Sequence, residues 1–137
     1  MGQIKELMTV KPRTVKQGDS IVEAAKLMKG EDTGIAPIVD GDRLVGVVTD
    51  RDIAIRVVAE GKDPQATKVE EIASQNLVTI DPQQDLDEAL RLMAQHQVRR
   101  LPVVEEDGKL VGIVAQADVA RHASADRTGE VVEEISE

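Results

Sequence analysis

The sequence contains no cysteine and no phenylalanine, tryptophan or tyrosine among its 137 residues. Without cysteine the chain forms neither disulfide bonds nor thiolate metal sites, so it cannot be stabilised in either of these ways. Without aromatic residues, the hydrophobic residues that make up 41% of the chain must build an aliphatic core. A nucleobase bound by this chain must therefore pack on aliphatic side chains, because aromatic stacking is not available.

Long basic tracts and long apolar runs are absent as well. The chain has 26 acidic and 17 basic residues and a formal net charge of −9, whereas nucleic-acid binding requires a basic surface. No apolar run is long enough to span a bilayer, and the N-terminus lacks the apolar region of a signal peptide. We therefore expect no nucleic-acid partner, no membrane partner and a cytoplasmic location.

The sequence also lacks the short motifs of common enzymes and metal sites. Gly41 and Gly46 have the spacing of a phosphate-binding loop, but Val47 stands where that loop needs lysine. The two histidines, His96 and His122, lie on separate predicted helices without metal-ligand spacing. We expect a protein that is not an enzyme and that holds neither a metal nor a resident cofactor.

An internal repeat organises the chain. Matching residues recur at an offset of 65, as in Thr14 and Thr79, or Pro37 and Pro102, and after one inserted residue Gly46 matches Gly112. Such a repeat indicates two copies of one supersecondary unit. We predict repeat 1 at residues 2–62, repeat 2 at residues 67–122 and an acidic tail at residues 123–137, with the two repeats in one compact module.

Each copy predicts the same order of elements: strand, helix, strand, strand, helix. Helical periodicity follows Ser20 and Asp85, and Gly30 is the expected end of the first of these helices. Apolar runs on either side of Asp40-Gly41 and Asp107-Gly108 predict two hairpins with tight turns. The expected fold class is α+β.

Two stretches carry a family resemblance. VTDRDIAIRVVAEG (residues 48–61) and HQVRRLPVVEEDGKLVGIV (residues 96–114), within the repeated pattern of residues 2–122, resemble the CBS domain, and two in tandem resemble a CBS pair, or Bateman module. The chain is especially similar to small stand-alone bacterial CBS-pair proteins of the hypoxic-response type. The resemblance implies two pseudo-symmetric repeats packed through their sheets, and two clefts between them that bind adenosine-containing ligands such as AMP, ADP, ATP or S-adenosylmethionine. It also implies a homodimer and an unidentified protein partner.

Thr49, Arg51 and Asp52 are the first candidate binding residues. The resemblance implies that the Asp52 carboxylate accepts hydrogen bonds from both ribose hydroxyls, that Thr49 adds one more, and that Arg51 contacts phosphate. The alternatives are that Thr49 or Asp50 caps the following helix and that Arg51 is an exposed surface residue. Because a cap requires only one of these side chains, the full set favours binding.

The resemblance implies that Arg99 and Arg100 contact the phosphates from the second copy, and the planar guanidinium of arginine suits this role. Their alternative is an ion pair with Glu31, Asp32 or the acidic tail. The matching residues in the first copy, Gly34 and Ile35, carry no charge, so the two clefts are unequal.

The remaining candidates are less polar or belong to the second copy. The resemblance implies that Thr14 and Thr79 bond the adenine or the phosphate, the alternative being strand propensity alone. The resemblance implies that a base packs against aliphatic side chains and backbone groups near the two prolines, the alternative being core packing; these residues are Ile35, Ala36, Pro37 and Leu101. Asp118 keeps the carboxylate that the resemblance assigns to the ribose. Alanine stands at the positions equivalent to Thr49 and Arg51, so we expect the better cleft on the Asp52 side.

Two functions follow from these features. The first is a regulatory module that senses an adenine nucleotide without catalysis. The second is a scaffold or protein-interaction module that keeps the fold and binds no ligand. Under the second, changing Asp52 or Arg100 alters stability alone.

Overall fold

The computed structural model describes residues 2–74 and 77–122, so the acidic tail predicted at residues 123–137 lies outside the described residues. The described residues fall into two compact units of mixed helices and strands, as the α+β prediction requires. Unit 1 draws its residues from Met1–Val10, Val78–Val103 and Val111–Glu137, and unit 2 from Lys11–Leu77 and Val104–Leu110.

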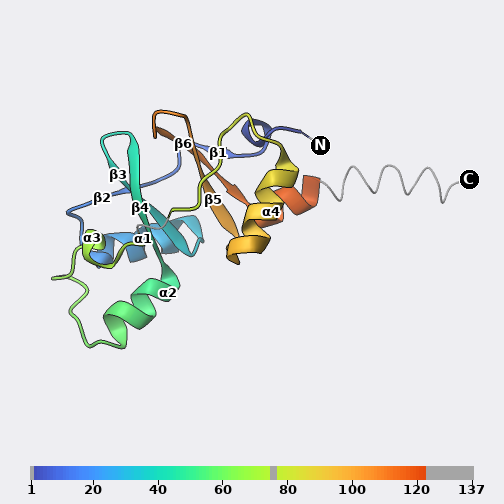
Figure 1. Cartoon of the computed structure of the whole chain (residues 1–137). Helices are drawn as coiled ribbons and strands as arrows, with labels where there is room; N and C mark the ends of the chain where they lie inside the picture. Colours follow the sequence, from blue (N-terminus) through green and yellow to red (C-terminus); the bar gives the residue numbers. More distant parts are fainter. Residues whose placement is uncertain (1, 75–76, 123–137) are drawn as a thin grey trace, which may run out of the picture. The chain divides into compact units, whose positions relative to one another are not determined.

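Unit 2 contains a three-stranded sheet in the order β2-β3-β4 (Figure 1). Strand β2 (Val15–Lys16) is parallel to β3 (Ile35–Asp40), which forms an antiparallel hairpin with β4 (Arg43–Thr49). Helix α1 (Ile21–Glu31) connects β2 to β3, and helix α2 (Asp50–Ile53) follows β4 directly and continues as a π-helical turn, η2 (Ala54–Val58). Helix α3 (Val69–Ile72) completes the unit.

Unit 1 repeats much of this plan. Its sheet has the order β1-β6-β5, formed by β1 (Thr9–Val10), β5 (Arg100–Val104) and β6 (Leu110–Ala115). A short 3-10 helix, η1 (Ile4–Glu6), precedes β1, helix α4 (Leu86–His96) precedes β5, and residues 116–122 are helical after β6.

The ends of the two long helices show where local sequence rules hold. Asp85 is the N-cap of α4, and its carboxylate accepts a hydrogen bond from the Asp87 N–H at 2.8 Å, whereas the side chain of Ser20 forms no such bond at α1. The prediction that Gly30 ends the first helix was wrong. Helix α1 continues to Glu31, because Asp32 adopts the left-handed conformation (φ 51°) that aspartate tolerates better than most residues.

Both predicted hairpin turns are confirmed. Gly41 and Gly108 have φ angles of +66° and +90°, the region that a side chain makes costly. The two turns also bond to one another within unit 2. The Leu44 N–H donates to the Gly108 carbonyl at 3.1 Å, and the Leu110 N–H donates to the Asp42 carbonyl at 2.9 Å.

A feature that the sequence did not predict is an exchange of the segments that precede each repeat's first strand. We call these the N-terminal lead-in (residues 2–10) and the central lead-in (residues 67–74). The N-terminal lead-in, at the start of repeat 1, packs with elements of repeat 2. The Ile4 N–H donates to the Gln84 carbonyl at 2.9 Å, β1 pairs with β6, and the fully buried Ile4 belongs to the same apolar cluster as Leu86.

The central lead-in packs in the same way with elements of repeat 1. The Ile21 N–H donates to the Thr67 carbonyl at 2.9 Å, and the Val69 N–H donates to the Asp19 carbonyl at 2.8 Å. Val69 is fully buried in the cluster that holds Ile21. Each core therefore combines residues of both sequence repeats, and it consists of aliphatic side chains and methionine, as the lack of aromatic residues requires.

The lead-ins explain a glycine that recurs in both repeats, Gly46 in β4 and Gly112 in β6. A Cβ atom on Gly112 would lie 2.7 Å from Met8 Sδ and 2.9 Å from the backbone oxygen of Thr9. A Cβ atom on Gly46 would meet the Cβ of Ala73 at 3.3 Å. The absence of a side chain at these positions allows a lead-in to cross the strand.

We predict that Gly112→Ala lowers the free energy of unfolding by about 1–3 kcal/mol, because the backbone of Thr9 cannot move away while β1 stays paired. Urea denaturation followed by far-ultraviolet circular dichroism measures this change. Gly18→Ala is the matched control, since nothing lies within 4 Å of a Cβ atom there. Equal stabilities of the two variants would contradict the steric role of Gly112.

Candidate functional site

The candidate residues of unit 2 gather at one end of its sheet. Thr14 directly precedes β2, Ile35 opens the parallel strand β3, and Thr49 ends the antiparallel strand β4. Ile35 and Thr49 are paired across the hairpin. Thr14, the start of β3 and the first turn of α2 therefore lie at the same end of the sheet.

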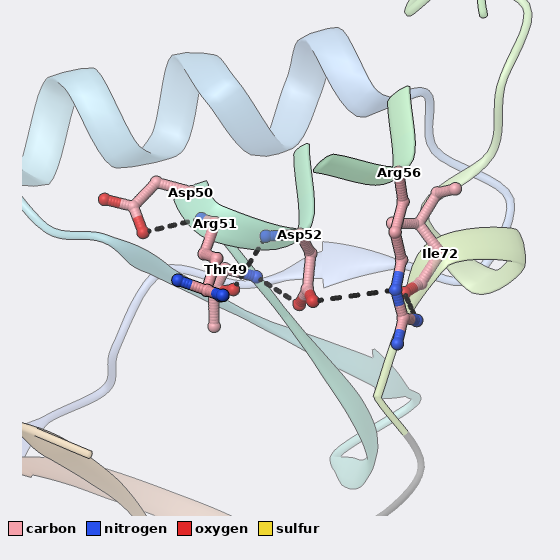
Figure 2. Close-up of polar contacts among 6 residues, drawn as sticks. All are labelled: Thr49, Asp50, Arg51, Asp52, Arg56 and Ile72. Atoms are coloured by element: carbon pink, nitrogen blue, oxygen red, sulfur yellow. Dashed lines mark hydrogen bonds and ion pairs between the residues drawn. The ribbon is translucent and has the colours of Figure 1, made fainter. Parts of the chain in front are cut away.

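Figure 2 shows how Thr49 and Asp52 lie at this end of the sheet. Thr49 is the N-cap of α2, and its Oγ1 accepts a hydrogen bond from the Asp52 N–H at 3.1 Å. In return, Asp52 Oδ2 accepts a hydrogen bond from the Thr49 N–H at 3.0 Å. Both side chains thus form a reciprocal capping box. The argument that capping requires only one of them was wrong, so their joint presence alone does not indicate a ligand.

The cap leaves part of each side chain available. The Thr49 hydroxyl keeps its proton as a donor, because the cap uses only an oxygen lone pair. Asp52 Oδ1 takes no part in the cap, and the Asp52 side chain is 18% exposed. Arg56 is its neighbour one turn later, with Nε at 4.0 Å from Oδ1.

Arg56 is a residue of this site that the sequence analysis missed. Its Nη1 group donates a hydrogen bond of 2.9 Å to the carbonyl of Ile72, at the end of α3 (Figure 2). The signal that could have found it is its spacing of four residues from Asp52, which places the two side chains on one face of a helix.

Arg51 is exposed beside this cap. Its backbone N–H donates to Asp50 Oδ1 at 2.8 Å, and the Asp50 N–H donates to the Gly34 carbonyl at 2.9 Å. Among the described residues of unit 2, no carboxylate forms an ion pair with the Arg51 guanidinium. This cation is therefore accessible to an anion from solution.

The candidate residues of unit 1 also share one end of their sheet. The exposed Arg99 and the half-buried Arg100 stand where β5 begins, and the Gln116 N–H, after β6, donates to the Arg99 carbonyl at 2.7 Å. Thr79 directly precedes Ile80, which forms a parallel bridge with Val103 of β5. This end of unit 1 therefore holds two arginines and a threonine hydroxyl.

The alternative partners of the two arginines are only partly described. Glu31 pairs with Arg13 at 3.6 Å, and the tail lies outside the described residues. Within the described part of unit 1, neither Arg99 nor Arg100 forms an ion pair. Gly34 takes the place of Arg99 in repeat 1, where a Cβ atom would lie 2.8 Å from Asp50 Oδ2.

Asp118 differs from Asp52 in its partners. Its Oδ1 forms an ion pair with Arg121 one turn later, and its side chain is 33% exposed. Ala115, in the position of Thr49, has no side-chain oxygen that can accept a bond from the Asp118 N–H. The second copy therefore has a carboxylate directed at a surface arginine, whereas the first has a carboxylate fixed by the helix cap.

The aliphatic candidates lie mostly inside the protein. Ala36 and Leu101 are fully buried in the apolar clusters of their units, Pro37 is buried and Ile35 is half-buried. Of these four side chains, Ile35 is the one with partial access to solvent. The others can offer a ligand chiefly their backbone groups.

Neither a cluster for a metal ion nor a helix for membrane crossing occurs among the described residues. No group of three or more His, Cys, Asp or Glu side chains within residues 2–74 and 77–122 is arranged to hold a metal ion. Over the same residues, no helix is long and apolar enough to cross a membrane.

Comparison with known proteins places these features in a family. The CBS domain family matches residues 4–59 and 69–125. The CBS domain-containing protein YhcV of Bacillus subtilis is 44% identical over 137 residues, which cover 99% of this chain and 96% of YhcV. Hypoxic response protein 1 of Mycobacterium tuberculosis is 40% identical over 123 residues, which cover 89% of this chain and 85% of that protein.

Solved structures similar to this chain point to the same family. The crystal structure of Hypoxic Response Protein I with two coordinated zinc ions has a TM-score of 0.81 at 40% identity, over 88% of this chain and 98% of that one. CBSX2 in complex with AMP has a TM-score of 0.80 at 26% identity, over 93% and 99% of the two chains. The CBS domain pair of MJ0100, in complex with 5′-methylthioadenosine and S-adenosylmethionine, has a TM-score of 0.79 at 30% identity, over 92% and 98%. With its fold, its repeat and its relatives in agreement, this chain belongs to the CBS-domain family and carries two CBS domains in tandem.

Proposed function

We propose that this chain is a non-catalytic regulatory module that binds an adenosine-containing ligand, such as AMP or ATP, between its two CBS repeats. The observation that carries the proposal is how the Asp52 carboxylate is held and exposed. One of its oxygens is fixed by the helix cap, the other is outside the cap, and the side chain is partly exposed at the end of the sheet. A carboxylate fixed in this way accepts hydrogen bonds from the two hydroxyls of a ribose.

The neighbouring groups suit the rest of such a ligand. The Thr49 hydroxyl has a proton to donate, and the exposed Arg51 is free of ion pairs among the described residues of unit 2. Arg99 and Arg100 offer two further cations for phosphate. In a chain with a net charge of −9, an anionic ligand needs such local cations.

The ligands of the relatives narrow the chemical class. AMP in CBSX2, and 5′-methylthioadenosine and S-adenosylmethionine in MJ0100, share adenosine and differ in the group at the 5′ position. The proposal therefore assigns the adenosine to Asp52 and Thr49 and leaves the 5′ group to the arginines.

Binding would act through the relative stability of conformations or of oligomers, since the proposed module has no catalytic residues. We include a homodimer or an unidentified protein partner in the proposal. Ile55 and Val58, three residues apart on η2, are 47% and 69% exposed and offer an apolar contact for either.

A ligand-free scaffold is the second candidate. The capping box favours it, because helix capping by itself gives Thr49 and Asp52 a structural role. The two candidates differ in what happens when the Asp52 charge is removed while its capping oxygen is kept.

We predict that Asp52→Asn weakens AMP binding by at least about tenfold, because the amide accepts hydrogen bonds from the ribose diol less well than the carboxylate does. Asp118→Asn should have a smaller effect, since Asp118 is already paired with Arg121. Isothermal titration calorimetry with AMP, ADP, ATP and S-adenosylmethionine measures the affinities.

Asp19→Asn is the matched control. Asp19 Oδ2 also accepts a backbone hydrogen bond, at 2.9 Å from Lys16, and the residue lies in unit 2 outside the candidate set. If none of the four compounds binds the parent, the ligand-binding proposal is overturned and the scaffold is the remaining candidate. If the parent binds and Asp52→Asn binds as tightly as Asp19→Asn and the parent do, the assignment of the ribose to Asp52 is overturned.

We also predict that Ala115→Thr raises the free energy of unfolding by about 1 kcal/mol, because a threonine there supplies the N-cap oxygen that repeat 2 lacks. Thr49→Ala should lower it by a similar amount. Urea denaturation measures both changes. A stability of Ala115→Thr at or below that of the parent would show that the second helix does not use this cap.

A further inference from the structure

Arg56 connects two parts of unit 2 that lie far apart in the sequence. It lies within the π-helical turn η2, with Nε at 4.0 Å from Asp52 Oδ1 and Nη1 at 2.9 Å from the Ile72 carbonyl (Figure 2). We propose that Arg56 is a positioning residue, anchored on α3, that holds the Asp52 carboxylate in the orientation that receives the ligand. This inference rests on the proposed function and names a residue that acts through Asp52.

The two oxygens of Asp52 have different partners. Oδ2 is fixed by the Thr49 N–H at 3.0 Å, while Oδ1 faces the Arg56 guanidinium. The hydrogen bond to Oδ2 and the guanidinium that faces Oδ1 both favour one orientation of the carboxylate. Each oxygen retains a lone pair, so the carboxylate can accept the two ribose hydroxyls without breaking either contact.

An ion pair of this length does not hold a side chain by itself. The Arg56 side chain is 54% exposed, and exposed ion pairs contribute little. The hydrogen bond to Ile72 provides the anchor. The Ile72 carbonyl is among the last of α3, and such carbonyls lack a partner within their own helix.

The anchor point is itself fixed to the strand that ends at Thr49. Two residues after Ile72, the Ser74 N–H donates to the Val47 carbonyl of β4 at 3.0 Å. Asp52 is therefore connected to β4 in two ways: directly through Thr49, and through Arg56, Ile72 and Ser74. A shift of the carboxylate would have to lengthen at least one of these contacts.

The π-helical turn that contains Arg56 supports a functional role for this residue. The Ala59 N–H donates to the Ala54 carbonyl, five residues earlier, at 2.9 Å. Such a turn changes the direction of the side chains within it relative to a regular helix, and π turns often occur at functional sites.

The test compares two ligands that differ only in the ribose hydroxyls, AMP and 2′,3′-dideoxyadenosine monophosphate, by calorimetry on the full chain. We expect Arg56→Gln to weaken AMP binding about tenfold and to leave dideoxy binding within about twofold of the parent, because the lost group acts through the carboxylate that reads the diol. Arg56→Lys should restore part of the AMP affinity. In an Asp52→Asn background, Arg56→Gln should cause no further loss.

Arg13→Gln is the matched control, since Arg13 is an exposed arginine of unit 2 that pairs with Glu31 at 3.6 Å. It removes the same charge and should leave both affinities unchanged. Equal weakening of AMP and the dideoxy compound by Arg56→Gln would indicate a general electrostatic or structural effect and would overturn the inference. Unchanged AMP binding in Arg56→Gln would overturn it as well.

A measurement without ligand separates this inference from the proposed function. If the parent binds no AMP, the proposed function fails, and the ¹⁵N NMR signal of the Arg56 Nε–H group still tests the contact with Asp52. A changed signal in Asp52→Asn, with no change in Asp19→Asn, would support Arg56 as the residue that holds Asp52. An unchanged signal in Asp52→Asn would overturn it.

Discussion

The reciprocal hydrogen bonds between Thr49 and Asp52 set the geometry on which the candidate site depends. They fix the residue at which β4 ends and α2 begins, and they orient one carboxylate at the end of the sheet. The same bonds satisfy the backbone N–H groups of the N-cap residue Thr49 and of Asp52 in the first turn of α2. A structural device thus holds a chemically useful group in place, and the capping role and the binding role are compatible because they use different lone pairs and protons.

The two repeats share a backbone plan and differ in chemistry. In repeat 1 the Asp52 carboxylate is fixed by the helix cap and lies 4.0 Å from Arg56 Nε, and a glycine at position 34 stands beside the neighbouring carboxylate of Asp50. In repeat 2 the cap residue is Ala115, the carboxylate of Asp118 pairs with Arg121, and Arg99 replaces the glycine. Repeat 1 therefore has the carboxylate that is fixed by a cap, and repeat 2 has two adjacent arginines where repeat 1 has Gly34 and Ile35.

Local signals in the sequence predicted the local structure well. The Asp-Gly pairs identified both hairpin turns, and Asp85 identified the start of α4, because turn and cap preferences depend on a few adjacent residues. The exchange of lead-ins was not predicted, because β1 has only two residues and its partner lies about a hundred positions away. Arg56 was missed for a similar reason: its role depends on where the Ile72 carbonyl lies, and no local pattern records that.

Binding of adenosine by the chain is the central claim, and the lack of aromatic residues makes such binding simple to measure. In equilibrium dialysis against AMP, adenine absorbance reports the ligand directly, because the protein contributes almost nothing at those wavelengths. The account predicts a saturable excess of AMP on the protein side that 2′,3′-dideoxyadenosine monophosphate reproduces only weakly. Equal concentrations of AMP on both sides of the membrane at every protein concentration would contradict it.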